Sequence, residues 1–150
     1  MPTFRNPFGL EIRPEPDATL PGDHQHHAEV TVHPQGFIPA HYHQPGPDGI
    51  YDHGNAEIYH WLGGGSLQIF LRASGRGRWQ TVLLSEENRT IAILAGWHHG
   101  AVAIGKTSVV FRALSRVDHF RANDQGGNVH RLPDGDQPLE IRHLMRASGA

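Results

Sequence analysis

Residues 36–64 read GFIPAHYHQPGPDGIYDHGNAEIYHWLGG, and this stretch decides how the rest of the chain is interpreted. His41 and His43 stand two residues apart, so in a β-strand both side chains project from the same face. Glu57 begins the next strand-like segment, and His99 follows a glycine turn later in the chain. An antiparallel barrel can bring these strand ends together, which makes the four residues candidate ligands of one metal ion.

The predicted donor set is three imidazole nitrogens and one carboxylate oxygen. Such a set suits Fe, Mn, Ni, Co or Zn, whereas Ca and Mg prefer shells of oxygen atoms. The chain has 13 histidines, and neutral imidazole is the commonest metal ligand. It has no cysteine, which excludes disulfides, thiolate zinc sites and a cysteine nucleophile. We therefore expect one divalent transition metal, with two positions left for water or a chelating substrate.

The remaining sequence predicts short strands separated by turns. Strand-like segments cover residues 28–33, 55–62, 66–72, 78–84, 90–95, 99–104 and 108–114. We expect 55–62 to pair with 66–72 across the glycines at 63–65, and 99–104 to pair with 108–114 across Gly105 and Lys106. Strands of this length without intervening helices indicate an all-β barrel or sandwich, and 150 residues indicate one domain.

Three parts of the chain are distinguished by composition. Residues 1–27 are interpreted as an N-terminal arm with an edge strand near 9–13, and residues 28–118 as the barrel. Residues 119–150 are a C-terminal extension with one late strand at 138–144 and a disordered tail from Arg146. The cluster DHQHH at 23–27 is interpreted as a solvated turn rather than a second metal site, because no partner ligand is spaced to match.

The proline- and glycine-rich segment 45–54 lies between the proposed ligands and is expected to form a loop at the mouth of the site. Tyr51, in this loop, is a candidate to close over a ligand; a plain surface loop is the alternative. Tyr59 shares a strand face with Glu57 and is the first candidate to orient or relay a proton, with a barrel-filling aromatic as the alternative. His33 is a weaker candidate.

Two tryptophans, Trp61 and Trp97, are candidate walls of a substrate pocket, although bulky barrel residues need no functional explanation. By strand alternation, His98 faces away from His99, and His60 faces away from Glu57. We interpret His60 as structural.

The two groups of ligands resemble the two motifs of the cupin family. The first motif is matched by Gly36, His41, His43, Glu57 and Gly64, and the second by Leu94, Gly96 and His99. The resemblance covers roughly residues 28–114. The interval between His43 and Glu57 is longer than usual, and Leu94 replaces a proline. The resemblance implies a single-domain cupin fold, that is, a double-stranded β-helix or jelly-roll barrel, here with an N-terminal arm.

Within the cupins, the chain most resembles the archaeal-type glucose-6-phosphate isomerases. The likeness lies in Glu57-Ile58-Tyr59 and in the segment 97–113, whereas Ile38-Pro39-Ala40 departs from the Thr-His-Gly of that family. It implies a metal-dependent isomerase or lyase that moves a proton through a metal-stabilised enediolate of a sugar, sugar phosphate or similar hydroxycarbonyl compound. A non-haem iron cupin dioxygenase and a non-catalytic small-molecule-binding cupin are the alternatives.

The expected partner is a small-molecule substrate. A net charge of −2 and a pI near 6.7 give no electrostatic reason to bind nucleic acid or an anionic membrane. The first residues lack the basic start and apolar core of a signal peptide, so we expect a cytoplasmic protein, and we expect a homodimer. For a phosphorylated substrate, Arg72, Arg78 and Arg112 are the candidate phosphate ligands.

Overall fold

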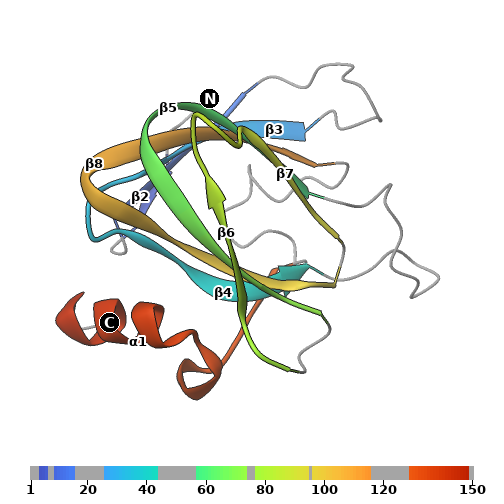
Figure 1. Cartoon of the computed structure of the whole chain (residues 1–150), viewed down its shortest axis with the longest axis vertical. Coiled ribbons are helices and arrows are strands. Elements are labelled where there is room, and N and C mark those ends of the chain that lie inside the picture. The colour runs from blue at the N-terminus through green and yellow to red at the C-terminus, as the bar shows by residue number, and fades with distance from the viewer. Residues whose placement is uncertain are drawn as a thin grey trace.

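The computed structural model describes residues 4–6, 9–15, 26–43, 57–73, 77–94, 96–115 and 129–148. Within these residues, nine antiparallel strands form one curled sheet, and a helix packs against its outside (Figure 1). The strands are β1 (Phe4–Asn6), β2 (Leu10–Pro14), β3 (His26–Val32), β4 (Phe37–His43), β5 (Glu57–Arg72), β6 (Gln80–Leu84), β7 (Thr90–Ile93), β8 (His98–Ser115) and β9 (Val129–Arg131). A 3₁₀ turn (Asp134–Asp136) precedes the helix α1 (Leu139–Ser148). The all-β class predicted from the sequence is confirmed.

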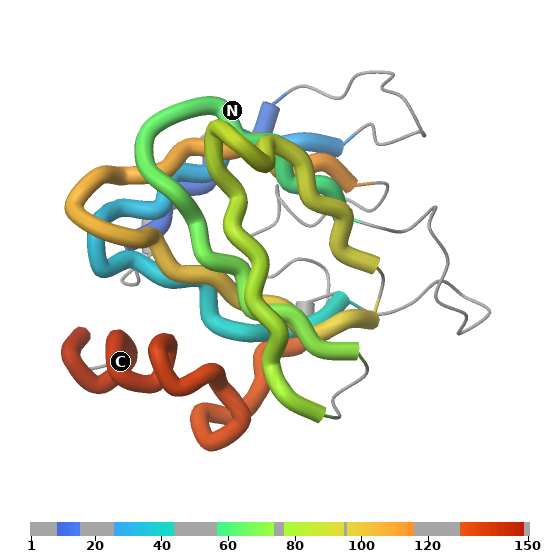
Figure 2. Tube along the Cα trace, in the orientation of Figure 1, coloured from blue at the N-terminus to red at the C-terminus, as the bar shows by residue number. Residues whose placement is uncertain are grey.

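Two long strands, β5 and β8, pair with each other along most of their length and carry the architecture. Their register divides the sheet into two halves. In one half the strand order is β1-β2-β3-β8-β5-β7, and in the other it is β9-β4-β8-β5-β6. The trace in Figure 2 shows both long strands bending sharply, so that the two halves face each other as a barrel.

The two predicted hairpins at the glycines are wrong. β5 continues through residues 63–65 and β8 continues through Gly105, so the segments on either side of each turn belong to one strand. Gly64 and Gly105 have φ of 85° and 82°, and the register between the strands shifts on both sides of Gly64. Glycine adopts this conformation without steric cost. The glycines therefore let two paired strands turn a corner together instead of reversing each strand.

The barrel core lies between the two halves of the sheet. Inward-facing residues alternate with outward ones along β3, where Ala28, Val30 and Val32 are buried, and along β5. The interior cluster also includes Leu67 and Phe111. Glu57 and His99, which are buried residues of the described barrel, are nevertheless polar.

The C-terminal extension differs from its prediction. Residues 138–144, predicted as a strand, lie mainly in α1, and the tail from Arg146 continues this helix to Ser148. Ile141 and Met145, four residues apart, share the buried face of the helix. They pack on Phe37 and Phe70 on the outer face of the sheet. The predicted strand is therefore wrong, because the buried apolar residues of this segment follow the helical period.

The N-terminal arm contributes to the sheet. β2 fulfils the strand predicted near residues 9–13, and β1 pairs outside it. The loop predicted at 45–54, including Tyr51, lies outside the described residues. No helix in the part of the chain that the structure describes is long and apolar enough to cross a membrane.

Candidate metal centre

A β-bulge in β4 determines which way the first two histidines point. Ile38 pairs with Ala101 and His41 pairs with His99, so two residues of β4, Pro39 and Ala40, lie opposite the single residue Gly100 of β8. A slip of one residue moves the following side chains to the other face of a strand. Ile38 before the bulge packs in the barrel interior, and the bulge turns His41 and His43 into the same interior.

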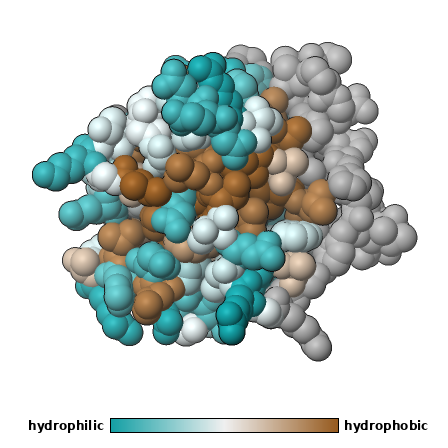
Figure 3. Space-filling view, viewed as in Figure 1, coloured by the Kyte–Doolittle hydropathy of each residue, from teal (hydrophilic) through white to brown (hydrophobic). Residues whose placement is uncertain are grey.

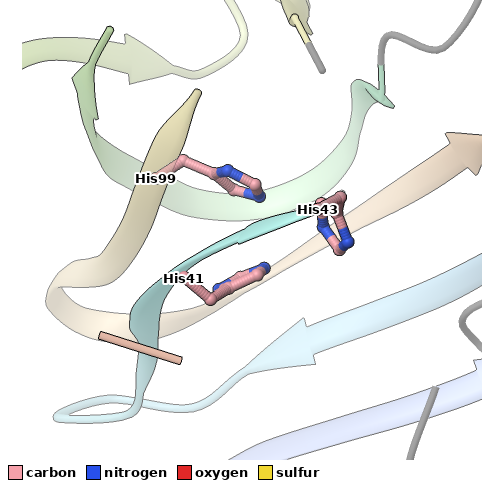
Figure 4. Close-up of side chains that lie close together, drawn as sticks. All are labelled: His41, His43 and His99. Atoms are coloured by element: carbon pink, nitrogen blue, oxygen red, sulfur yellow. The ribbon is translucent and has the colours of Figure 1, made fainter. Parts of the chain in front are cut away.

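The three histidines meet at one end of the barrel (Figure 4). His41 and His43 come from β4, and His99 comes from the start of β8. The ring centroids lie 4.3 Å apart for His41 and His99, 4.9 Å for His41 and His43, and 5.2 Å for His43 and His99. One ring nitrogen from each residue lies within 4.8 Å of the other two. The structure thus brings together the three histidines selected from the sequence.

Two of the imidazoles are oriented by backbone carbonyl groups. His41 Nδ1 lies 2.7 Å from the carbonyl oxygen of Pro39, and His99 Nδ1 lies 3.1 Å from that of Trp97. A carbonyl oxygen only accepts hydrogen bonds, so each Nδ1 carries the proton. In the neutral ring the lone pair is then on Nε2. This is the arrangement that fixes the tautomer of histidines that bind metals.

Glu57 joins the cluster from the start of β5. One of its carboxylate oxygens, Oε2, lies 3.0 Å from His43 Nε2, and the residue is only 5% exposed. The Tyr59 hydroxyl donates a hydrogen bond to the Glu57 carboxylate. Burial, together with the charge of Glu57 and this hydrogen bond, raises the pKa of Tyr59 well above 10.0. Tyr59 therefore remains a protonated phenol at neutral pH, and it presents a proton to Glu57 rather than removing one.

The donor set fits a transition metal. Metal–nitrogen bonds of about 2.0–2.1 Å put adjacent ligands of one ion about 3.0–3.4 Å apart. Nitrogens that lie within 4.8 Å of one another would therefore close by up to about 1.4–1.8 Å on binding an ion. A buried carboxylate beside them supplies an oxygen donor and negative charge, which balances the charge of a divalent ion. His41, His43, His99 and Glu57 together can therefore hold one such ion, with the rings of His41 and His99 already oriented by backbone carbonyl groups.

The surroundings of His41 keep its imidazole neutral. Burial, followed by the neighbouring His99 and His43, lowers the pKa of His41 well below 6.5. The unfolded chain then binds more protons than the metal-free folded protein at pH values below about 6.5. We expect the free energy of unfolding of the metal-free protein to fall as the pH drops through this window, by up to about 1.4 kcal/mol per pH unit from this one group.

Urea denaturation of the metal-free protein between about pH 5 and 8 measures this dependence. His41→Gln should flatten the curve, because glutamine does not titrate. His60→Gln serves as the matched control, since His60 is exposed and its Nδ1 lies 2.9 Å from the Thr90 hydroxyl. Equal pH slopes for the wild type and His41→Gln would contradict the assignment.

The other residues selected from the sequence are more dispersed. Trp97 is partly buried against the barrel core and orients His99 through its carbonyl group. Trp61 lies on the same strand face as Glu57, but its indole N–H donates to the carbonyl oxygen of Gly65 at the corner of β5. Its role as a pocket wall remains a prediction.

His33 is not brought to the centre by the contacts in the structure. Its Nδ1 lies 3.0 Å from the Ser108 hydroxyl, at the bend of β8, and its Nε2 lies 3.3 Å from the carboxylate of Glu11.

Sequence alternation correctly places His60 on the outside of the barrel. His98 also faces outward, where it stacks on Tyr42 and accepts a hydrogen bond from Arg72.

The cluster at 23–27 is only partly described. His27 Nδ1 lies 3.3 Å from the Glu15 carboxylate, and His26 and His27 both belong to β3. Residues 23–25 lie outside the described part of the chain. The predicted solvated turn therefore does not extend to the last two residues of this cluster, which form the start of a strand.

One residue that contacts the site backbone was missed by the sequence analysis. Gln137, in the C-terminal extension, is 2% exposed and forms hydrogen bonds to both backbone groups of Ala40, next to His41. It lies almost a hundred residues away along the chain and belongs to no recognisable motif. The sequence contained no signal that would have paired these two residues.

No family model matches the sequence, and no curated protein matches it in a sequence comparison. Solved structures do match. The capsular polysaccharide assembling protein CapF from Staphylococcus aureus superposes with a TM-score of 0.59 at 15% identity, over 87% of this chain and 31% of that chain. A variant of the Bacillus subtilis oxalate decarboxylase OxdC gives 0.59 at 18% identity, over 80% and 29% of the two chains.

A dTDP sugar isomerase from Desulfovibrio desulfuricans gives a TM-score of 0.55 at 18% identity, over 71% of this chain and 63% of that chain. The chain spans about a third of the length of CapF. These structural neighbours are cupins. The curled antiparallel sheet of this chain is, like theirs, a jelly-roll barrel. More particularly, the chain has the cupin fold, as its two motifs predict. These structural matches do not show the narrower resemblance to archaeal-type glucose-6-phosphate isomerases.

Proposed function

We propose that the protein is a metal-dependent cupin enzyme that holds one divalent transition metal on His41, His43, His99 and Glu57. The observation that carries this proposal is the convergence of three imidazoles, two of them locked by backbone carbonyl groups with Nε2 left as the donor atom. Fixing each ring in one orientation costs side-chain conformational entropy, so these hydrogen bonds must offset that loss. Fe, Mn, Ni, Co and Zn all suit this mixed nitrogen and oxygen set.

The reaction that we infer is an isomerisation or elimination on a sugar or similar hydroxycarbonyl compound. A bound metal ion would polarise a carbonyl oxygen and stabilise negative charge as a proton leaves the neighbouring carbon. Two structural neighbours, a dTDP sugar isomerase and an oxalate decarboxylase, support chemistry on small oxygenated molecules. The resemblance of Glu57-Ile58-Tyr59 to the archaeal-type isomerases supports the same class.

The protein residues would handle the proton. Glu57 lies between His43 and the Tyr59 hydroxyl. Its carboxylate would take the proton from the substrate carbon and return it, while the Tyr59 hydroxyl, which keeps its own proton at neutral pH, would hold the carboxylate by donating a hydrogen bond. Tyr59 is 4% exposed, and its ring packs on Phe111 with centroids 4.6 Å apart. This packing holds the phenol in one orientation and keeps water from it. Tyr59 and Glu57 are therefore the proposed catalytic pair.

Two of the three arginines proposed as phosphate ligands make contacts elsewhere in the described structure. Arg72 lies over the Trp79 ring on the outer face, with its guanidinium carbon 4.4 Å from the ring centroid. Arg112 contacts the Glu15 carboxylate at 3.4 Å, and Arg78 is exposed. None of these three candidates from the sequence supplies a guanidinium fork to the histidine cluster in the part of the chain that the structure describes.

Metal content of untagged protein, measured by plasma mass spectrometry, tests the first part of the proposal. About one transition-metal ion per chain is expected.

Proton–deuterium exchange at carbon tests the second part of the proposal. The metal-loaded protein is incubated without oxygen with a panel of aldoses, ketoses and hydroxy acids. Exchange without oxygen supports an isomerase or lyase. Strict dependence on Fe(II) and oxygen would instead indicate a dioxygenase, and ligand binding without exchange a binding protein.

Tyr59→Phe is expected to retain the metal and lose turnover, by about 10²- to 10⁴-fold, because the positioned base that its hydroxyl holds contributes that much. The substitution keeps the ring that packs on Phe111 and removes only the hydroxyl. Steady-state kinetics and metal content measured on the same sample separate the two effects. His33→Ala, which changes a residue at the opposite bend, is the control. Unchanged turnover in Tyr59→Phe would remove Tyr59 from the mechanism.

We also propose that the protein forms a homodimer. Figure 3 shows apolar side chains gathered across the middle of the face on which β5, β6 and β7 lie. Leu83, on β6, is 42% exposed. Among the described strands, β6 pairs only with β5, and apolar surface beside such an open edge favours association. Light scattering after gel filtration measures the mass directly.

A further inference from the structure

Gln137 connects the C-terminal extension to the strand that carries two of the histidines. The backbone N–H of Ala40 donates to Gln137 Oε1 at 2.6 Å. Gln137 Nε2 donates to the carbonyl oxygens of Ala40 and Leu132, at 3.1 and 3.0 Å. The Ala40 carbonyl also accepts from the Leu132 N–H at 2.9 Å. One buried amide thus binds both backbone groups of a single residue of β4.

Ala40 is the residue for which this attachment matters most. It is fully buried and belongs to the bulge that lies opposite Gly100. In a regular ladder its N–H would pair with the neighbouring strand, whereas here the Gln137 side chain provides the acceptor. The preceding residue, Pro39, has no N–H to contribute. The bulge is therefore held open by a side chain from outside the barrel.

The same extension also packs behind His99. A Cβ atom placed on Gly100 would lie 2.9 Å from Ile141 Cδ1 of α1 and 3.0 Å from the Cα atom of Ala40. The helix, β4 and the start of β8 are thus in close contact directly behind the histidine cluster. Movement of the extension would be transmitted to the backbone of His41 and His99.

We propose that Gln137 is a positioning residue for the metal centre. Its amide holds the bulge at Ala40, and the bulge directs His41 and His43 into the barrel; the inference rests on the proposed metal site. Without the amide, two buried backbone groups of Ala40 lose hydrogen bonds, and regular pairing of β4 with β8 becomes favourable. Regular pairing turns His41 to the outer face, because side chains alternate along a strand.

Gln137→Met tests this role, because methionine has a similar volume and lacks the amide. Titration with Co(II), followed by visible absorption, reports both the affinity and the geometry of the ligands. We expect Co(II) to bind about 10- to 100-fold more weakly, with an altered absorption spectrum. Met145→Ala is the matched control: it removes a buried side chain of α1 from the same extension but none that contacts Ala40 through a hydrogen bond.

Wild-type affinity and spectrum in Gln137→Met would overturn the proposal, as would an equal loss in Met145→Ala. If the wild type itself binds no Co(II), the proposed function fails, and hydrogen exchange in the metal-free protein decides the role of Gln137. Faster exchange at the amides of Ala40 and His41 in Gln137→Met, but not in Met145→Ala, supports positioning; unchanged exchange contradicts it. Should Gln137→Met not fold, Gln137→Glu, which lacks the amide donor, replaces it in both measurements.

Discussion

His99→Ala is expected to abolish stoichiometric metal binding, with affinity falling at least about 100-fold, which exceeds the usual effect of changing a residue outside the ligand shell. His99 is 1% exposed, and its ring lies between those of His41 and His43 and the Tyr59 ring. Alanine removes one of three nitrogen donors and leaves the other two on a single strand. Metal content and Co(II) titration measure the loss.

His98→Ala is the matched control for this experiment. His98 adjoins His99 in β8 but faces outward, where it stacks on Tyr42 with centroids 5.1 Å apart. Its removal is expected to leave the metal content at the wild-type level. Loss of metal from His98→Ala and retention in His99→Ala would show that the ligands lie on the other face of the strand.

Gly64→Ala is expected to destabilise the fold by about 2 to 4 kcal/mol, the range for a side chain forced into both backbone strain and a clash. Gly64 has φ of 85°, which L-residues adopt only at a cost. A Cβ atom there would also collide with the carbonyl oxygen of Ser108 on β8. The collision is with backbone, so no side-chain rotation relieves it. Urea denaturation measures the free energy of unfolding.

Gly63→Ala, one residue earlier, separates these effects from the loss of a glycine as such. Gly63 has an ordinary φ, and a Cβ atom placed on it meets no atom within 4 Å among the described residues. We expect its free energy of unfolding to change by less than about 1 kcal/mol. Similar losses in the two variants would mean that the corner of β5 does not depend on the conformation of Gly64.

Much of the candidate site could be predicted because it depends on local rules. The two-residue interval between His41 and His43 places them on one face of any strand, and the alternation from Glu57 to Tyr59 does the same. The donor types limit the metals that can bind. The same rules separated His99 from His98 and Glu57 from His60, and the structure agrees in both cases.

The errors occurred where one local pattern is compatible with two tertiary arrangements. Glycines between two strand-like segments indicate a hairpin when each segment is considered alone, but the mutual pairing of β5 and β8 makes them a shared corner. Residues 138–144 were too few to distinguish a strand from a helix that buries Ile141 and Met145. His33 was selected by residue type, and its position at the far bend depends on long-range pairing.

The sequence by itself determined the all-β class, the chemistry of the donor atoms and the side of each strand that its histidines share, because these follow from residue type and from the period of two. The tertiary structure alone decided which side faces the interior. That choice depends on the bulge at Pro39 and Ala40, opposite Gly100, and on a hydrogen-bonding partner, Gln137, from the other end of the chain. A bulge costs one unpaired backbone position, and only a group brought there by folding can satisfy it.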